Sequence, residues 1–219
     1  MIKDRVNQQA AFTLLEMVVV IGIVFLLITL VTVGASQMVQ SSRLSEAAVM
    51  MENTLLLASQ QASLEGREME VRFYEMPPEA GAPAQFSAFQ VFGYDIETSP
   101  SASEYESPGG AAFQPRVIAL GGLQRLPSGV VIMKQGSYST LVSHASRVAN
   151  PETTEIEGRQ CATTRIRFLP RGGTDLQKDL VWTLMLTDEA STQVNALPDN
   201  YVVLRLDPAT SRATIFRPE

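Results

Sequence analysis

The sequence predicts an α+β fold in which one long N-terminal helix packs on an antiparallel β-sheet, with the outline of a ladle. Residues 12–35 are almost entirely apolar, and residues 36–66 continue without proline as an amphipathic helical stripe. After Gly66 the apolar residues recur with a period of two, which is typical of β-strands. Residues 67–219 are therefore expected to form one β-rich globular domain.

The segment 12–35 has the length and composition of a membrane span. Its 24 residues include one formal charge, Glu16. At about 1.5 Å per residue a helix of this length measures roughly 36 Å, which exceeds a hydrocarbon core of about 30 Å. Lys3 and Arg5 precede the segment, so we expect a cytoplasmic N-terminus and a C-terminal domain on the other side of the membrane.

Glu16 is costly inside such a span and is expected to need a partner. The span contains no basic residue, and the next one along the chain is Arg43. Cleavage between Ala11 and Phe12 would create an α-ammonium group four residues from Glu16. On a neighbouring copy this group could lie about 4 Å from the carboxylate, with an attraction of about 4 kcal/mol at an effective dielectric near 20. The acid therefore predicts side-by-side assembly.

The residues around this acid resemble a known signal. A short charged leader followed by Ala11-Phe12-Thr13-Leu14-Leu15-Glu16 is similar to the type III signal of type IV pilins and type II secretion pseudopilins. The resemblance implies removal of residues 1–11 by a prepilin peptidase, N-methylation of Phe12, and Glu16 as the acid at mature position five. The chain departs from the family pattern at Ala11, where Gly is usual, and at Val33, where many major pilins have Pro.

The same resemblance implies a fold, partners and a location. The fold would be a pilin-like ladle. The partners would be the prepilin peptidase/N-methyltransferase, other pilin or pseudopilin subunits bound through the N-terminal helix, and inner-membrane lipid before assembly. The chain would cross the bacterial inner membrane once, with its C-terminal domain in the periplasm, and would then enter a filament or reach the cell surface.

Later segments resemble minor subunits. Residues 58–62, 66–73 and 167–175 are similar to H-type minor pseudopilins and FimT-like pilins. Details at residues 72–74, 88–90, 124–129 and 215–218 are most similar to the Verru_Chthon cassette protein D group. We therefore expect a structural, minor subunit of a type IV pilus-like or pseudopilus filament and no enzymatic activity.

Three other interpretations are open. Val33-Gly34-Ala35 satisfies a small-x-small cleavage rule for a Sec signal peptide, although the apolar stretch is long for one and contains an acid. The helix could also be a simple anchor. In that case the rest of the chain could be a membrane-anchored periplasmic enzyme or binding domain that uses the helix only as a tether.

Few residues suggest catalysis or metal binding. His144 is the only histidine and Cys161 the only cysteine, so a histidine-rich metal site and an intrachain disulfide are excluded. We expect a surface histidine, a half-buried thiol and no cofactor. The acidic residues near the C-terminus lack the spacing of a calcium loop and are expected to be solvated: Asp175, Asp179, Asp188, Glu189 and Asp199.

Nucleic-acid binding is not expected, because the chain has a net charge of −6. A DNA-receptor role would need a local basic strip such as Arg165, Arg167 and Arg171. Residues 95–115 and 150–158 have the composition of loops, and 137–148 of a short helix. Strands are expected at 69–73, 86–94, 117–120, 130–133, 164–169, 181–187, 201–206 and 213–217.

Overall fold

A computed structural model describes residues 13–76, 84–95, 116–135, 137–143, 152–193 and 197–217. Within these ranges the side chains of residues 29–37, 190 and 193 are not described. The chain divides into two compact units, Met1–Ser41 and Ser42–Glu219. The predicted cleavage site, Ala11 and Phe12, lies outside the described residues.

The N-terminal element is α1, an α-helix of 52 residues spanning Leu14–Glu65. The residue after its end is Gly66, whose φ of 66° is the left-handed conformation that favours glycine after a helix. This agrees with the helix expected from the absence of proline and from the apolar stripe. No helix in the described part of the chain is long and apolar enough to cross a membrane. Of the span expected at 12–35, residue 12 and the side chains of 29–35 are outside the description.

The second unit contains an antiparallel sheet, which the described residues show with ten strands. The strands are β1 Met69–Met76, β2 Gln85–Asp95, β3 Arg116–Ala119, β4 Gln124–Arg125, β5 Val130–Ile132, β6 Glu152–Ile156, β7 Arg159–Phe168, β8 Trp182–Asp188, β9 Tyr201–Leu206 and β10 Ala213–Phe216. A short helix, α2 Thr140–Ser143, and a 3-10 helix, Glu189–Gln193, complete the described elements.

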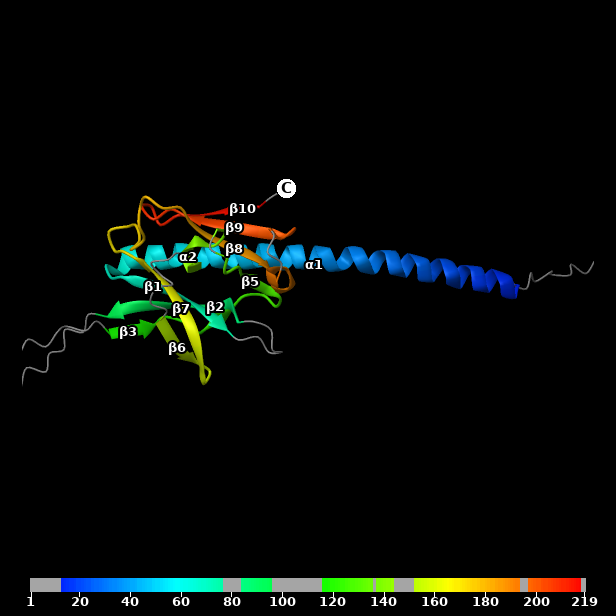
Figure 1. Ribbon diagram of the computed structural model, residues 1–219, viewed down its shortest axis with the longest axis horizontal. Helices are drawn as coiled ribbons and strands as arrows, with labels where there is room; N and C mark the ends of the chain where they lie inside the picture. Colours follow the sequence, from blue (N-terminus) through cyan, green and yellow to red (C-terminus); the bar gives the residue numbers. More distant parts are fainter. Residues whose placement is uncertain are drawn as a thin grey trace, which may run out of the picture. The chain divides into compact units, whose positions relative to one another are not determined.

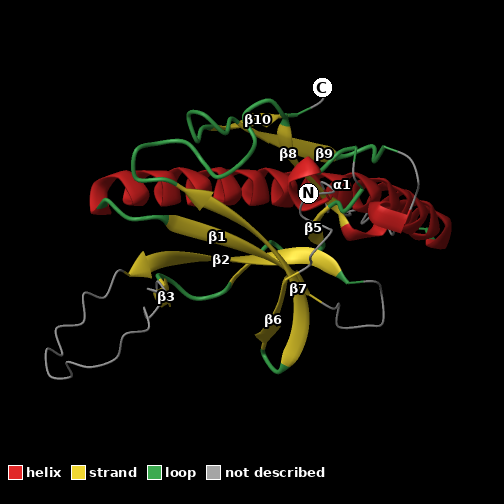
Figure 2. Cartoon of the chain, turned by 60° about the vertical axis from the view of Figure 1, so that its left-hand side comes forward, coloured by secondary structure: helices red, strands yellow, loops and turns green. Residues whose placement is uncertain are grey.

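The strand order is β10-β9-β8-β5-β2-β1-β7-β6, and β3 and β4 also pair with β2. Within the second unit the sheet curves around the C-terminal half of α1. In Figures 1 and 2 the strands β8, β9 and β10 lie on one side of this helical segment and β1, β2 and β7 on the other. Consequently one segment of helix is buried by strands that are far apart in the sequence.

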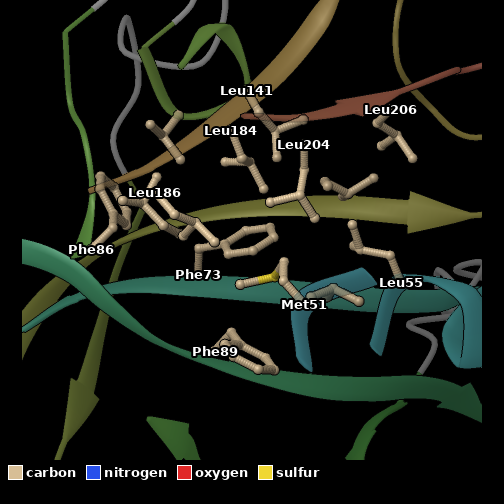
Figure 3. Close-up of a cluster of buried hydrophobic side chains, with 14 of the residues drawn as sticks. Met51, Leu55, Phe73, Phe86, Phe89, Leu141, Leu184, Leu186, Leu204 and Leu206 are labelled. Carbon is tan, nitrogen blue, oxygen red and sulfur yellow. The ribbon is translucent and has the colours of Figure 1, made fainter. Parts of the chain in front are cut away.

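The core lies between this helical segment and the inner face of the sheet. The helix contributes Leu44, Ala48, Met51, Leu55, Ala58 and Ala62, the stripe that the sequence predicts, and each is at most 1% exposed. Figure 3 shows Met51 of α1 close to Phe73 and Phe89 of the sheet, and Leu55 of α1 on the side of Leu204 and Leu206 of β9. Burial of this apolar surface is the main force that holds the helix on the sheet.

One loop prediction is wrong. Most of residues 150–158 form a hairpin, in which β6 pairs with β7. The turn residues Glu157 and Gly158 have φ values of 52° and 76°, which is the backbone of a tight two-residue hairpin turn. Thr153 and Thr154 are good strand formers. The acidic composition of the segment concealed these signals. Of the other expected loop, 95–115, all but residue 95 lies outside the described residues. The helix expected at 137–148 is present in part as α2, Thr140–Ser143, and residues 144–148 lie outside the description.

Candidate functional site

The N-terminal motif contains a helix cap. Thr13 precedes α1, and its amide N–H and hydroxyl donate hydrogen bonds to Glu16 Oε2 over 2.9 and 3.0 Å. In return the Glu16 amide donates to the Thr13 hydroxyl over 3.3 Å. This reciprocal arrangement is a capping box, which satisfies amide groups that would otherwise lack a partner in the first turn of the helix.

The cap gives Glu16 a partner within its own chain, in addition to the cation that its charge predicts. Both bonds end on Oε2, and Oε1 has no hydrogen-bond partner among the described residues. The carboxylate therefore caps its own helix and still offers one oxygen to a cation. The signal was present in the sequence, because Thr-x-x-Glu before an apolar run is the usual pattern of a capping box.

The helix that follows the cap presents an apolar surface. Every large apolar side chain from Leu14 to Ile28 is at least 48% exposed. Exposed apolar patches of this extent are typical of contact sites for proteins or membranes. Glu16 is the one acidic residue of the first helical turn.

A second site of unusual chemistry is Glu70, a carboxylate that is 0% exposed on β1. It lies between Met69 and Val71, which face the core, so its side chain points to the opposite face of the sheet. Arg72 Nε donates a short hydrogen bond to Oε1. Tyr94 donates its hydroxyl to Oε2 over 2.5 Å, and Arg167 donates its Nε over 3.2 Å.

Two more charged groups extend this Glu70 network. Arg165 lies directly opposite Arg72 in the β1–β7 register, a pair of like charges that would repel without an intervening anion. Arg165 Nη1 lies 3.8 Å from Glu70, and its Nη2 lies 2.8 Å from Glu152. Arg167 also lies 3.8 Å from Glu68. Glu70 therefore allows two facing arginines to occupy one sheet face.

The Glu70 network includes two of the three arginines of the basic strip that a DNA receptor would need. Arg165 and Arg167 do share a sheet face, as the alternation predicts. Both, however, lie within 4 Å of carboxylates, and Arg167 also packs over the ring of Tyr94 at 5.3 Å. Arg171 is exposed on the turn beyond β7. The strip is thus largely neutralised within its own chain.

Beside the network is a small apolar cluster of Tyr74, Met76, Ala88 and Cys161. Burial raises the pKa of Tyr74 to about 12, and its hydroxyl has no hydrogen-bond partner among the described residues. Burial and the hydrogen bond to Glu70 raise the pKa of Tyr94 to about 12. Burial also raises the pKa of the Cys161 thiol, which is 1% exposed and donates to Met76 Sδ at 3.7 Å. A protonated, buried thiol is a poor nucleophile.

The other residues considered for catalysis or metal binding do not form a site among those described. His144 lies outside the description. Asp175 accepts a hydrogen bond from the Arg167 amide, and Asp188 accepts one from Ser191. In the described ranges no three histidine, cysteine or acidic side chains are placed to hold a metal ion.

Comparison with known proteins does not supply an identity. No protein-family model, no curated protein and no solved structure matches the chain.

Proposed function

We propose that this chain is a structural, minor subunit of a type IV pilus-like or type II secretion pseudopilus filament. A prepilin peptidase would cleave it after Ala11 and methylate the new terminus at Phe12. Residues 12–35 would anchor the subunit in the inner membrane before assembly and pack against other subunits afterwards. The pilin-like ladle fold is part of this proposal.

The observation that carries the proposal is the exposed apolar helix beginning at Leu14, with one acid in its first turn. Exposed apolar side chains favour burial in lipid or against a protein. A membrane offers burial in lipid, and a filament offers burial against other protein subunits. The signal-like residues from Ala11 to Glu16 supply the reason to expect both in succession.

The outer half of α1 offers a second surface for subunit contacts. Val49, Leu56, Leu57 and Leu64 are between 47% and 85% exposed, and their spacing of seven or eight residues places them along one side of the helix. They lie away from the buried stripe that packs on the sheet. This surface supports a helix that contacts its own sheet and other subunits at once.

In this proposal the negative charge of Glu16 promotes assembly by attracting a neighbouring subunit. Its Oε2 is used by the cap, and Oε1 is open to the α-ammonium group of Phe12 on a neighbouring subunit. The cap holds the side chain in one position, which reduces the entropy that binding would cost. Insertion into the membrane does not depend on this charge.

Substitutions at the cap separate the two roles of Glu16. Glu16→Gln keeps an oxygen that can accept from Thr13 but removes the charge, whereas Thr13→Ala weakens the cap, at a cost of about 1 kcal/mol, and keeps the charge. Each variant would be expressed in native cells, and its amount compared between the membrane fraction and the sheared filament fraction. We expect both to insert, Glu16→Gln to be depleted from filaments, and Thr13→Ala to be incorporated. Normal incorporation of Glu16→Gln would contradict the proposed role of the charge.

The rival function, a periplasmic enzyme or binding domain with a helical tether, makes a different prediction. Exchange of residues 12–35 for an unrelated span would leave its activity intact. In a filament subunit the same exchange would abolish incorporation. Comparing the amount of the exchanged chain in the membrane fraction and in the sheared filament fraction therefore distinguishes the two functions.

A further inference from the structure

A pocket of about 360 Å³ opens at one end of the β9–β10 pair, outside the core. Arg205 of β9 and Thr214 of β10 lie opposite each other in the register, and both side chains are exposed on the face turned away from α1. The segment 178–181 and the turn 207–212 form the walls. The volume lies within the range of small ligand sites.

The basic residues of this pocket differ from those of the Glu70 network. Lys178, Arg205 and Arg212 line the pocket and are exposed, and none of them forms a salt bridge with a described residue. Arginines that form no salt bridge among the described residues are well suited to bind a carboxylate from another molecule.

The acids in the pocket do not cancel this charge. Asp207 is engaged by its own turn: it accepts from the Ala209 amide over 2.9 Å and from the Thr210 hydroxyl over 2.8 Å. The Thr210 and Ala209 hydrogen bonds, aided by Arg205, lower the pKa of Asp207, so it stays ionised. With Asp179, the pocket has three basic and two acidic side chains, an excess of one positive charge in a chain of net charge −6.

The same pocket has an apolar side. Val181 and Phe216 line it and are 56% and 50% exposed. A ligand that fits would therefore place an anionic group near Arg205 and an apolar group on Phe216. A simple anion could bind near Arg205, but it has no apolar group to cover Phe216.

The strand next to the pocket supplies a means of recognition. β10 is at the end of the strand order, and its outer edge pairs with no other strand in the described part of the chain. Open edges accept a further strand, with backbone hydrogen bonds giving affinity and side-chain pockets giving specificity.

We propose that β10 and this pocket bind an extended acidic peptide segment of a partner protein. The peptide adds to the edge of β10, a carboxylate enters the pocket toward Arg205 and Arg212, and an alternate apolar side chain covers Phe216. A nucleic acid fits less well, because Asp179 and Asp207 would face its phosphates and the chain is acidic overall. This proposal does not depend on cleavage or filament assembly at the N-terminus.

The test is a binding titration with the full-length chain in a mild non-ionic detergent. The probe is a short fluorescent peptide of alternating Glu and Val, compared with a Gln–Val peptide of equal length. We expect only the acidic peptide to bind, with affinity that falls as salt is added. Arg205→Gln and Arg212→Gln should each weaken binding about tenfold. Arg171→Gln, an exposed arginine outside the pocket, is the matched control and should bind as the unchanged chain does.

Three outcomes would overturn the proposal. The first is equal weakening by Arg171→Gln, which would indicate non-specific charge attraction. The second is displacement of the peptide by inorganic phosphate or by a single-stranded DNA oligonucleotide at equivalent concentration, which would indicate an anion or nucleic-acid site. The third is that the bound peptide does not slow the hydrogen exchange of the β10 amides. The unfolding temperature of each variant is also measured. If it equals that of the unsubstituted chain, a loss of binding is not caused by a loss of folding.

Discussion

The Glu70 network is expected to be a major source of stability in the globular unit, and Glu70→Gln tests this. The substitution keeps the shape of the side chain but removes the negative charge that Arg72, Arg165 and Arg167 share. It also introduces an amide N–H₂ group facing arginine donors. The three arginines would then repel one another on one sheet face.

The magnitude follows from burial and contacts. Removing one partner of a buried ion pair costs about 3–5 kcal/mol. Glu70 is fully buried, but its arginines are 19–33% exposed and regain water when the carboxylate is lost. We therefore expect the lower end, about 3 kcal/mol. At roughly 2–4 °C per kcal/mol for a domain of this size, the unfolding temperature should fall by about 6–12 °C.

The assay is thermal unfolding of the full chain in detergent, followed by circular dichroism. Glu157→Gln is the control, because Glu157 pairs with Arg125 at 2.6 Å while both side chains are more than half exposed. An exposed pair of this kind should contribute less than about 1 kcal/mol. If Glu70→Gln lowered the unfolding temperature no more than Glu157→Gln does, the stabilising role assigned to Glu70 would be wrong.

Two further predictions concern the core and the response to pH. Leu55→Ala opens a cavity where α1 meets the sheet and should lower the free energy of unfolding by about 2–5 kcal/mol in a denaturant titration, whereas the exposed Leu57→Ala should change it little. Tyr74 and Tyr94 have folded-state pKa values raised to about 12 from 10, so the unfolded state loses these protons first. Their contribution is complete below pH 10 and is lost as pH rises through about 12. Urea midpoints across this range should fall together with the appearance of tyrosinate absorbance, and Tyr94→Phe should reduce the fall; tyrosines that all ionise near pH 10 in the folded chain would contradict this.

The helix and most strands could be predicted from the sequence because their signals are local. The absence of proline, the apolar stripe from Leu44 to Ala62 and the glycine at 66 together determine the outer half of α1 and its end. The strand at 201–206 was predicted with its observed bounds because apolar and polar residues alternate there. The strand expected at 164–169 is the second half of β7, but β6 and the hairpin turn were missed because the acidic residues outweighed the turn signal of Glu157 and Gly158.

The sites were harder to predict because they depend on pairing between distant segments. Glu70 meets Arg167 only because β1 pairs with β7, almost a hundred residues later in the chain. The pocket near Arg205 depends on the meeting of segment 178–181 with the turn 207–212. The alternation of apolar and polar residues along each strand predicts which face of the sheet a residue lies on. It does not predict which strands are neighbours. The cap of Thr13 and Glu16 is different, since its pattern was fully local.

The most direct measurement for the proposed function is the mass of the N-terminal peptide of the protein isolated from native membranes. The proposal requires a chain that begins at Phe12 and carries an added methyl group, since cleavage there creates the amine that Glu16 is proposed to meet. A chain that begins at Met1 would mean a simple anchor, and one that begins at Ser36 would mean a Sec signal peptide. Either result would contradict the filament function.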